Sequence, residues 1–255
     1  MKVLKFKLHG KTAFFKKPEV NSYYYFTYGN IHKVALLGIF GAILGYGGYN
    51  QLLLNKMIDK KYSCDFPEFY KKLKDLKVAI EPLNYGGAIS KKIQFFNNSV
   101  GYASKELGGN LIVKEQWLED PEWNIYIIID NDEAVKLKDY IISKKAVYMP
   151  YLGKNDHYAN ISEIEVIEDI KEVSEINRID SLCYRDQVTF AMIDDEDDEE
   201  EDIDYMFKYS EKLPVALDKD TNMYILESFV YSNMSIHAIR DIKVYKIGDK
   251  NIVFF

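Results

Sequence analysis

The segment from Phe14 to Phe26, FFKKPEVNSYYYF, places lysines next to a run of aromatic residues. Proteins that bind single-stranded nucleic acid use this combination, because ammonium groups attract phosphates and aromatic rings stack on bases. The tyrosines could equally belong to the core of an adjoining sheet, so the segment alone leaves both interpretations open. If it binds nucleic acid, the candidate contacts are Lys11, Lys16, Lys17, Asn21, Ser22 and Tyr25.

Two of the four histidines lie beside lysines in loop-like sequence. His32 precedes Lys33 in IHKV, and His157 follows Lys154 in GKNDHY. An imidazole next to an ammonium group could contact RNA, or could act as a general acid or base in RNA cleavage. The sequence suggests no Ser-His-acid set, and its two cysteines have no second Cys or His at ligand spacing, so neither a zinc site nor a disulfide framework is expected.

The charge is distributed unevenly along the chain. Residues 1–114 contain 18 lysines and 7 acidic residues, a balance of +11, whereas the remainder contains 15 basic and 33 acidic residues, a balance of −18. Ten of those acids lie in residues 194–204, DDEDDEEEDID, which are expected to form a solvated loop or, alternatively, a mimic of nucleic acid that covers a basic surface. The cationic N-terminal half favours a partner that carries phosphates.

Hydrophobic periodicity predicts the order strand, helix, strand, hairpin, strand, helix, strand across residues 1–170. The first strand alternates apolar residues with lysine in VLKFKLHG, and WNIYIIID predicts a buried strand. The predicted class is α+β: a ferredoxin-like (RRM-like) domain with an inserted β-hairpin at residues 86–109, framed by two glycine pairs. A β-rich C-terminal portion, residues 171–255, follows and contains the acidic loop 194–204.

The stretch HKVALLGIFGAILGYGGYN could be a membrane span, a phosphate loop or a buried helix. Its uncharged core includes five glycines, an Asn and a Gln, which is too polar for a span, and no P-loop lysine stands at the required offset. Gly38, Gly41 and Gly45 recur on one helical face, predicting a helix of roughly 20 or more residues packed closely against the sheet. The N-terminus lacks a secretory h-region, so a cytoplasmic protein without membrane contact is expected.

Several segments together resemble a known family. The first strand, the AFFKKP loop and KVALLGIFGAILG resemble the start of the CRISPR-associated Cascade subunit that caps the 5′ handle of the crRNA. EQWLEDPEWNIYIIID and YMPYLGKNDHYANI agree with this resemblance, which covers the chain from Met1 to about Ile161. The overall length is similar to that of the type I-B branch.

The resemblance implies a RAMP protein with a ferredoxin-like palm and a hairpin thumb. Such a subunit would hold the crRNA 5′ handle, abut the Cascade backbone and large subunits, and meet target DNA indirectly through the complex, without a metal or other cofactor. Lys91, Lys92 and Lys105 of the thumb would face RNA or the backbone subunit. The related type I-C subunit is a metal-independent endoribonuclease that processes pre-crRNA with a Tyr, Lys and His group. Type I-B systems use a separate nuclease, so a noncatalytic role is expected.

Overall fold

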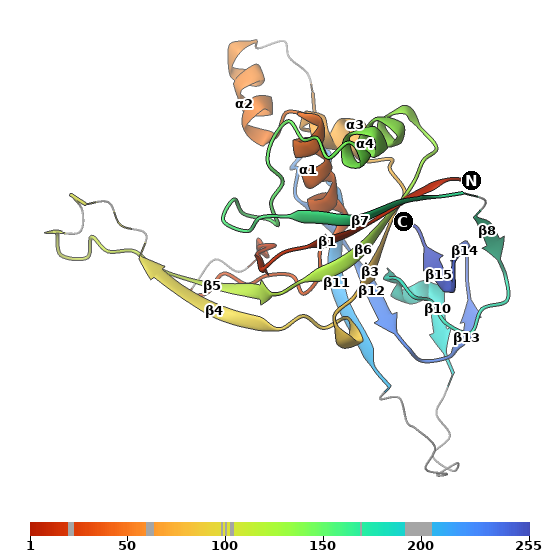
Figure 1. The fold of residues 1–255 in the computed structure, drawn as a ribbon. Helices are drawn as coiled ribbons and strands as arrows, with labels where there is room; N and C mark the ends of the chain where they lie inside the picture. Colours follow the sequence, from red (N-terminus) through yellow and green to blue (C-terminus); the bar gives the residue numbers. More distant parts are fainter. Residues whose placement is uncertain are drawn as a thin grey trace.

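The computed structural model describes residues 1–19, 23–59, 64–97, 99, 101–102, 105–168, 170–191 and 206–255. Its centre is a four-stranded antiparallel sheet in the order β3-β6-β1-β7 (Figure 1). Counted among these four strands alone, the order is 4-1-3-2, which is the ferredoxin-like arrangement that the periodicity predicts. The strands are β1 (Val3–His9), β3 (Val78–Pro82), β6 (Glu122–Ile128) and β7 (Asn160–Ile167).

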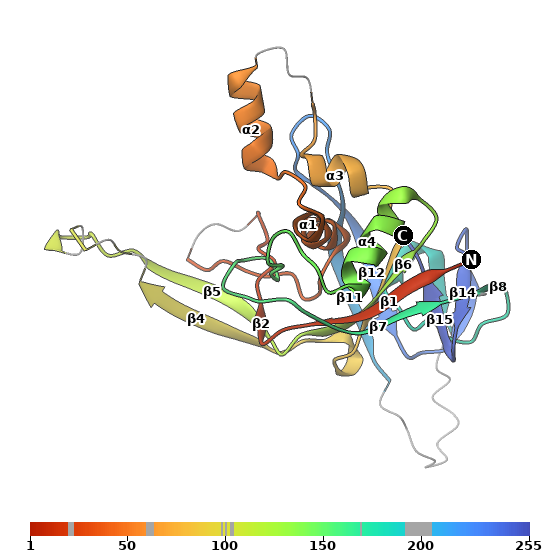
Figure 2. The same cartoon turned by 45° about the horizontal axis from the view of Figure 1, so that its top comes forward.

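Two helices, α1 (Lys33–Leu44) and α4 (Asp132–Ile142), lie side by side on one face of this sheet (Figure 2). The alternation of β1 explains why they pack there, since Leu4, Phe6 and Leu8 are fully buried on one face of the strand. The ring of Phe6 meets that of Phe40 in α1 edge to face, with centroids 6.3 Å apart. The predicted pattern of β1 is therefore confirmed.

The helical stretch that begins at Lys33 is broken, so the prediction of one long helix is wrong. At Gly45 the backbone has φ 79°, and its N–H donates to carbonyls of the last turn of α1. A left-handed residue ends a helix, and glycine adopts that conformation without a steric penalty. A second helix, α2 (Tyr49–Ile58), then leads away from the body (Figure 1).

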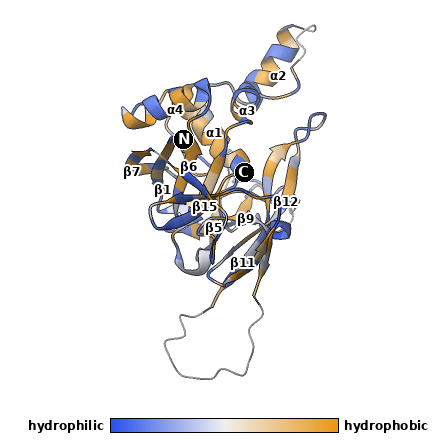
Figure 3. Cartoon of the chain, turned by 90° about the vertical axis from the view of Figure 1, so that its right-hand side faces the viewer, coloured by the Kyte–Doolittle hydropathy of each residue, from blue (hydrophilic) through white to orange (hydrophobic). Residues whose placement is uncertain are grey.

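Helix α2 carries hydrophobic residues although only Leu52 is buried (Figure 3). Leu53, Leu54, Met57 and Ile58 are all at least half exposed. In the part of the chain that the structure describes, no helix is both long enough and apolar enough to cross a membrane.

Of the aligned glycines, Gly41 makes the close approach that the spacing predicts, but its neighbour is not the sheet. A Cβ at Gly41 would lie 2.5 Å from the Cβ of Phe69 in α3 (Glu68–Leu73). A Cβ at Gly38 would meet no described atom within 4 Å. The contact at Gly41 therefore joins two helices. A Cβ at Gly45 would lie 2.9 Å from the Val147 side chain, so two of the three glycines make close approaches, and neither approach is to the sheet.

The thumb is a hairpin of β4 (Lys91–Asn97) and β5 (Ile112–Glu119), with β2 (Thr12–Ala13) on the other edge of β5 (Figure 1). The first predicted glycine pair, Gly86 and Gly87, lies at its base in the turn η1 (Tyr85–Gly87), with positive φ at both residues. The second pair does not form a hinge, because the return strand pairs Ile112 with Asn97 and continues to Glu119. The range 86–109 therefore cuts the hairpin short.

The C-terminal portion is β-rich, as predicted. Its described residues form three small sheets, and the core of one of them is continuous with the core under α1, through Leu213, Phe229 and Tyr231. The division of the chain at residue 170 stays a prediction, and the acidic run 194–204 lies outside the described residues. The strands are β8 (Lys171–Val173), β9 (Cys183–Tyr184), β10 (Val188–Phe190), β11 (Lys208–Leu217), β12 (Tyr224–Ser232), β13 (Ile236–Ile239), β14 (Val244–Ile247) and β15 (Lys250–Val253).

Candidate nucleic-acid interface

The thumb has two faces, and neighbouring lysines lie on opposite ones because side chains alternate along a strand. Lys92 pairs with Trp117, whereas Lys91 pairs with Leu118. We call the Trp117 side the inner face and the Lys91 side the outer face. The inner face consists of Lys92, Gln94, Phe96, Val113, Glu115 and Trp117, and the outer face of Lys91, Ile93, Phe95, Lys114 and Gln116.

Lys154 connects the inner face to the loop that precedes β7. Its Nζ lies 3.3 Å from each carboxylate oxygen of Glu115 and 4.9 Å from the centroid of the Phe96 ring. The Trp117 Nε1–H donates to the same carboxylate at 2.8 Å. An ammonium group over an aromatic face and beside a buried carboxylate is held in one place.

Lys16 forms a second ammonium–ring pair, with its Nζ 4.1 Å from the centroid of the Tyr25 ring. Tyr25 is fixed against the edge of β5, because its N–H donates to the Lys114 carbonyl and its carbonyl accepts from the Gln116 N–H, each at 2.9 Å. Tyr25 bridges in register with Glu115, so its ring belongs to the inner face of the thumb. The pairs Lys16–Tyr25 and Lys154–Phe96 therefore lie on the same side of the molecule.

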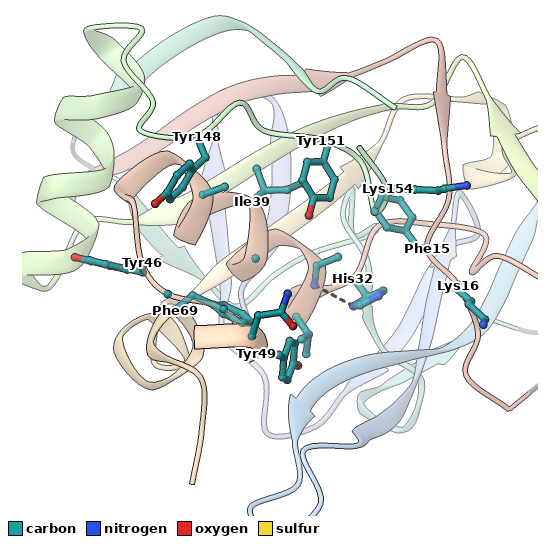
Figure 4. A pocket seen from close by; sticks show the side chains of 18 of the residues that line it. Phe15, Lys16, His32, Ile39, Tyr46, Tyr49, Phe69, Tyr148, Tyr151 and Lys154 are labelled. Carbon is teal, nitrogen blue, oxygen red and sulfur yellow. Dashed lines mark hydrogen bonds between the residues drawn. The ribbon is translucent and has the colours of Figure 1, made fainter. Parts of the chain in front are cut away.

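A groove with a volume of about 960 Å³ begins at these two lysines and follows α1 (Figure 4). Its floor is a side of α1 that carries the half-buried Ala35, Gly38 and Ala42 and the buried Ile39. Among the described residues that line it, the two lysines are the charged side chains, and there is no Asp or Glu. Aromatic side chains form much of the wall: Tyr46, Tyr49, Phe69, Tyr148, Tyr151 and Tyr224.

The loop that carries Tyr148, Tyr151 and Lys154 crosses the chain at Phe14 very closely. Gly153 has φ 87°, and a Cβ there would lie 2.0 Å from the Phe14 carbonyl oxygen. The Phe14 N–H donates to the Leu152 carbonyl at 3.1 Å, which joins the two segments. This crossing places Lys154 and Lys16 at the same end of the groove. The segment from Val147 to Ala159 contains one isolated bridge, between Tyr151 and Tyr158, and no strand.

His32 is the N-cap of α1, and its Nδ1 accepts the Ala35 N–H at 3.2 Å. The ring is 3% exposed and lies edge-on to Tyr28 and Tyr224, with centroids 5.2 and 5.3 Å away. Burial lowers the pKa of this imidazole to about 3 because the charged form would lose its hydration. His32 therefore stays neutral at neutral pH and serves as a helix cap that also lines the groove.

His157 is also buried, at 1% exposure, in a different environment. Its Nδ1 lies 2.6 Å from the Thr12 hydroxyl, and its ring meets Trp117 edge-on at 4.6 Å. Burial lowers the pKa of this imidazole as well, and its Nε2 has no hydrogen-bond partner among the described residues. Neither of the two predicted histidines lies at the surface.

Three other predicted contacts point away from the groove. Lys33 donates to the Phe255 carbonyl at 3.1 Å, and its half-buried ammonium group has a pKa lowered by desolvation. Lys17 binds the Glu211 carboxylate at 2.8 Å. Lys91 lies on the outer face of the thumb, where burial lowers the pKa of its ammonium group.

The remaining predicted contacts are peripheral or outside the described residues. Lys11 is almost fully exposed and 3.8 Å from Asp120, and Lys92 lies 3.3 Å from Glu119 on the inner face. Lys105 is exposed in the turn of the thumb. Asn21 and Ser22 are outside the described residues. Of the predicted set, the structure brings together Lys16, Tyr25, Lys92, Lys154 and His157 around the inner face.

The aromatic wall of the groove does not follow from local sequence patterns. Tyr148 and Tyr151 lie in AVYMPY, a short apolar run in which Pro150 disfavours a strand interior. Tyr49 lies in the stretch for which the glycine spacing predicts one long helix. Phe96 and Glu115 reach the site because β4 pairs with β5, and no local sequence pattern specifies that pairing. Within the described ranges, no three His, Cys, Asp or Glu side chains converge as metal ligands.

Comparisons with known proteins connect this fold to CRISPR systems. No family model matches the chain, and no curated protein matches it by sequence. A chain of a CRISPR RNA-guided surveillance complex superposes with a TM-score of 0.52 at 13% identity, over 92% of this chain and 90% of that one. A CRISPR protein from Archaeoglobus fulgidus gives 0.47 at 11% identity, over 100% and 98% of the two chains. A chain of the type III-B Cmr-beta complex bound to cognate target RNA and AMPPnP gives 0.45 at 12%, over 92% and 86%. The chain therefore has the fold of a protein found in a CRISPR RNA-guided surveillance complex.

Proposed function

We propose that this chain is a noncatalytic crRNA-binding subunit of a type I-B Cascade complex. In this proposal it holds the 5′ handle of the crRNA, contacts the backbone and large subunits, and meets target DNA through the assembled complex. The observation that carries the proposal is the pair of lysines, Lys16 and Lys154, each over an aromatic ring at the mouth of a groove whose described lining has no carboxylate.

A ligand that combines negative phosphates with flat rings suits such a surface. Single-stranded nucleic acid offers phosphates to ammonium groups and flat bases to aromatic rings, and binding of this kind is tolerant of sequence. A chain of about the same length and fold is part of an RNA-guided surveillance complex. Together with the resemblance of the three sequence segments, this supports crRNA as the ligand.

A salt titration with matched lysine variants tests the proposal. We expect the full chain to bind single-stranded repeat-derived RNA with an affinity that falls as salt rises, because each neutralised phosphate releases counterions. Lys16→Gln and Lys154→Gln should each reduce the slope of log K against log salt by about 0.7. Lys171→Gln, an exposed lysine on β8 at the opposite end of the molecule from the thumb, is the control (Figure 1).

Assembly provides an independent test. Co-expression with crRNA and the backbone subunits should yield a complex that contains this chain. Purification of crRNA with backbone subunits but without this chain, or RNA affinity unaffected by both lysine variants, would contradict the proposal.

The alternative is an endoribonuclease that processes pre-crRNA without metal, as in the type I-C branch. Such a reaction needs a group that exchanges a proton with the RNA, and general acid–base catalysis favours a pKa near the working pH. Burial lowers the pKa values of both His32 and His157, which supports the noncatalytic proposal. Incubation with repeat RNA in EDTA tests it, since cleavage that His157→Ala or His32→Ala abolishes would favour the enzyme instead.

A further inference from the structure

Gly38 has no evident structural reason to be glycine. It lies within α1, has no positive φ, and a Cβ added to it would meet no described atom within 4 Å. Glycine inside a helix costs about 1 kcal/mol relative to alanine. Gly41 differs, since its missing Cβ makes room for Phe69. The missing side chain of Gly38 leaves free space at the floor of the groove.

Flat side chains stand on both sides of this open floor (Figure 4). Tyr148 and Tyr151 lie along one side of α1, and Tyr49 and Phe69 lie along the other. The three tyrosines are exposed, at 60%, 44% and 42% respectively, so their rings are accessible to a ligand. The floor has no side chain at Gly38, and this open position between aromatic walls has room for a planar group.

The charges around the groove indicate what that planar group belongs to. Lys16 and Lys154 stand at one end, and the described lining residues include no carboxylate. A phosphate-bearing chain complements these charges, whereas an apolar protein segment offers no negative group to pair with the two lysines. The amide side chains of Asn50 and Gln51 also line the groove, and amides can bond to the edges of unpaired bases.

We propose that the groove seats an unstacked nucleobase of single-stranded RNA over Gly38, with its flanking phosphates at Lys16 and Lys154. This inference rests on the proposed function, which brings RNA to this side of the molecule, and adds that a base enters the groove along α1. Gly38 is then a positioning residue that keeps the base site open.

Two substitutions at Gly38 separate space from helix propensity. Gly38→Ala adds a methyl group that meets no described protein atom within 4 Å, and it should weaken RNA binding less than the larger side chain of Gly38→Leu does. Gly38→Leu fills the floor and should weaken binding of an oligouridylate of about 12 nucleotides by roughly tenfold or more, because one stacked base contributes on that scale. Thermal unfolding of both variants establishes that they are folded, since leucine is also a good helix former.

A second probe separates bases from phosphates. An abasic oligonucleotide of the same length carries the same charge, and its weaker binding should be equal for wild type and Gly38→Leu. A 2-aminopurine placed in the strand should be quenched on binding to wild type and remain bright with Gly38→Leu. Equal affinity of wild type and Gly38→Leu for the base-bearing strand would overturn the inference.

The outcomes also distinguish this inference from the proposed function. If Lys16→Gln and Lys154→Gln weaken RNA binding but Gly38→Leu does not, the RNA-binding role stands and the base site falls. If Gly38→Leu instead releases a protein subunit from the complex while RNA affinity is unchanged, the groove is a protein site and the inference is wrong. If wild type binds neither oligonucleotide, the proposed RNA-binding function and the base site at Gly38 are both wrong.

Discussion

Lys154 and Glu115 join two parts of the molecule that the chain order keeps apart. The Lys154 ammonium group lies 3.3 Å from each oxygen of a carboxylate that is buried in β5, so the loop beside the groove is tied to the thumb. Lys154 also lines the groove. Glu115 and an RNA phosphate would therefore compete for Lys154.

Glu115→Gln should have opposite effects on stability and on RNA binding. The free energy of unfolding should fall by about 1–3 kcal/mol, because the buried acceptor of Lys154 and Trp117 loses its charge. The affinity for single-stranded RNA should rise, because Lys154 loses its buried carboxylate partner and keeps only the exposed Asp156, 3.6 Å away, among the described carboxylates. Urea unfolding and a fluorescence binding titration measure the two effects. Glu119→Gln is the control, because its pair with Lys92 is about 40% exposed on both sides and should change stability by less than about 1 kcal/mol. A fall in both stability and affinity would show that Glu115 supports the site only by holding its shape.

Gly153→Ala should disrupt the crossing of the groove loop over Phe14. The substitution forces a Cβ both into a left-handed backbone and against the Phe14 carbonyl, so the loss of stability should exceed the roughly 1 kcal/mol of the backbone term alone. Gly108→Ala is the matched control, because φ is 77° there and a Cβ meets no described atom within 4 Å. Thermal melts of both variants give the comparison, and equal losses would mean that the close approach at Phe14 is relieved by a small shift.

Gly38→Ala and Gly41→Ala should change stability in opposite directions although they lie in one helix. Alanine at position 38 should stabilise α1 by up to about 1 kcal/mol, since it adds helix propensity without a clash. Alanine at position 41 should destabilise by about 1–3 kcal/mol, because its Cβ would overlap Phe69. Urea midpoints test both, and destabilisation by Gly38→Ala would mean that position 38 is needed for the fold.

His32 should make the protein less stable as the pH falls below neutral. The folded state keeps this imidazole neutral down to about pH 3, whereas the unfolded chain takes up a proton near pH 6.5. Stability linked to His32 is therefore present above pH 6.5 and is lost between pH 6.5 and 3, at up to about 1.4 kcal/mol per pH unit.

A variant that cannot titrate isolates this contribution. Asparagine can also cap a helix, so His32→Asn should flatten the pH dependence of the unfolding free energy, even though it loses ring contacts and is less stable at pH 7. His237→Asn, at an exposed position of β13, is the control. Parallel curves for wild type and His32→Asn would show that His32 does not cause the acid sensitivity.

Local patterns predicted the order of elements in the palm but not where its first helix ends. The alternation in β1 and the isoleucine run of β6 specify strands because each side of a sheet repeats every second residue. Gly38, Gly41 and Gly45 look alike in the sequence, yet only Gly45 adopts a positive φ. That difference depends on the neighbours that α1 and α2 meet, which the local sequence does not contain.

The candidate site could be predicted in kind but not in detail. Lysines beside tyrosines indicated a surface for nucleic acid, and Lys16 and Tyr25 do form a pair. Strand alternation would have separated Lys91 from Lys92 once β4 was assigned. The burial of His32 could not be predicted, because it depends on Tyr224, a residue that lies far along the chain.

The thumb continues into an inner strand of the central four-stranded sheet, not into an edge strand. Only Asp120 and Pro121 separate β5 from β6, and β6 lies between β3 and β1 in the central sheet. The Gly10 N–H donates to the Pro121 carbonyl and the Asp120 N–H donates to the Lys11 carbonyl, so this two-residue junction is pinned on both residues. The base of the thumb is therefore held rigidly against the central sheet. A force that acts on the tip of the thumb is passed directly to β6, an inner strand of that sheet.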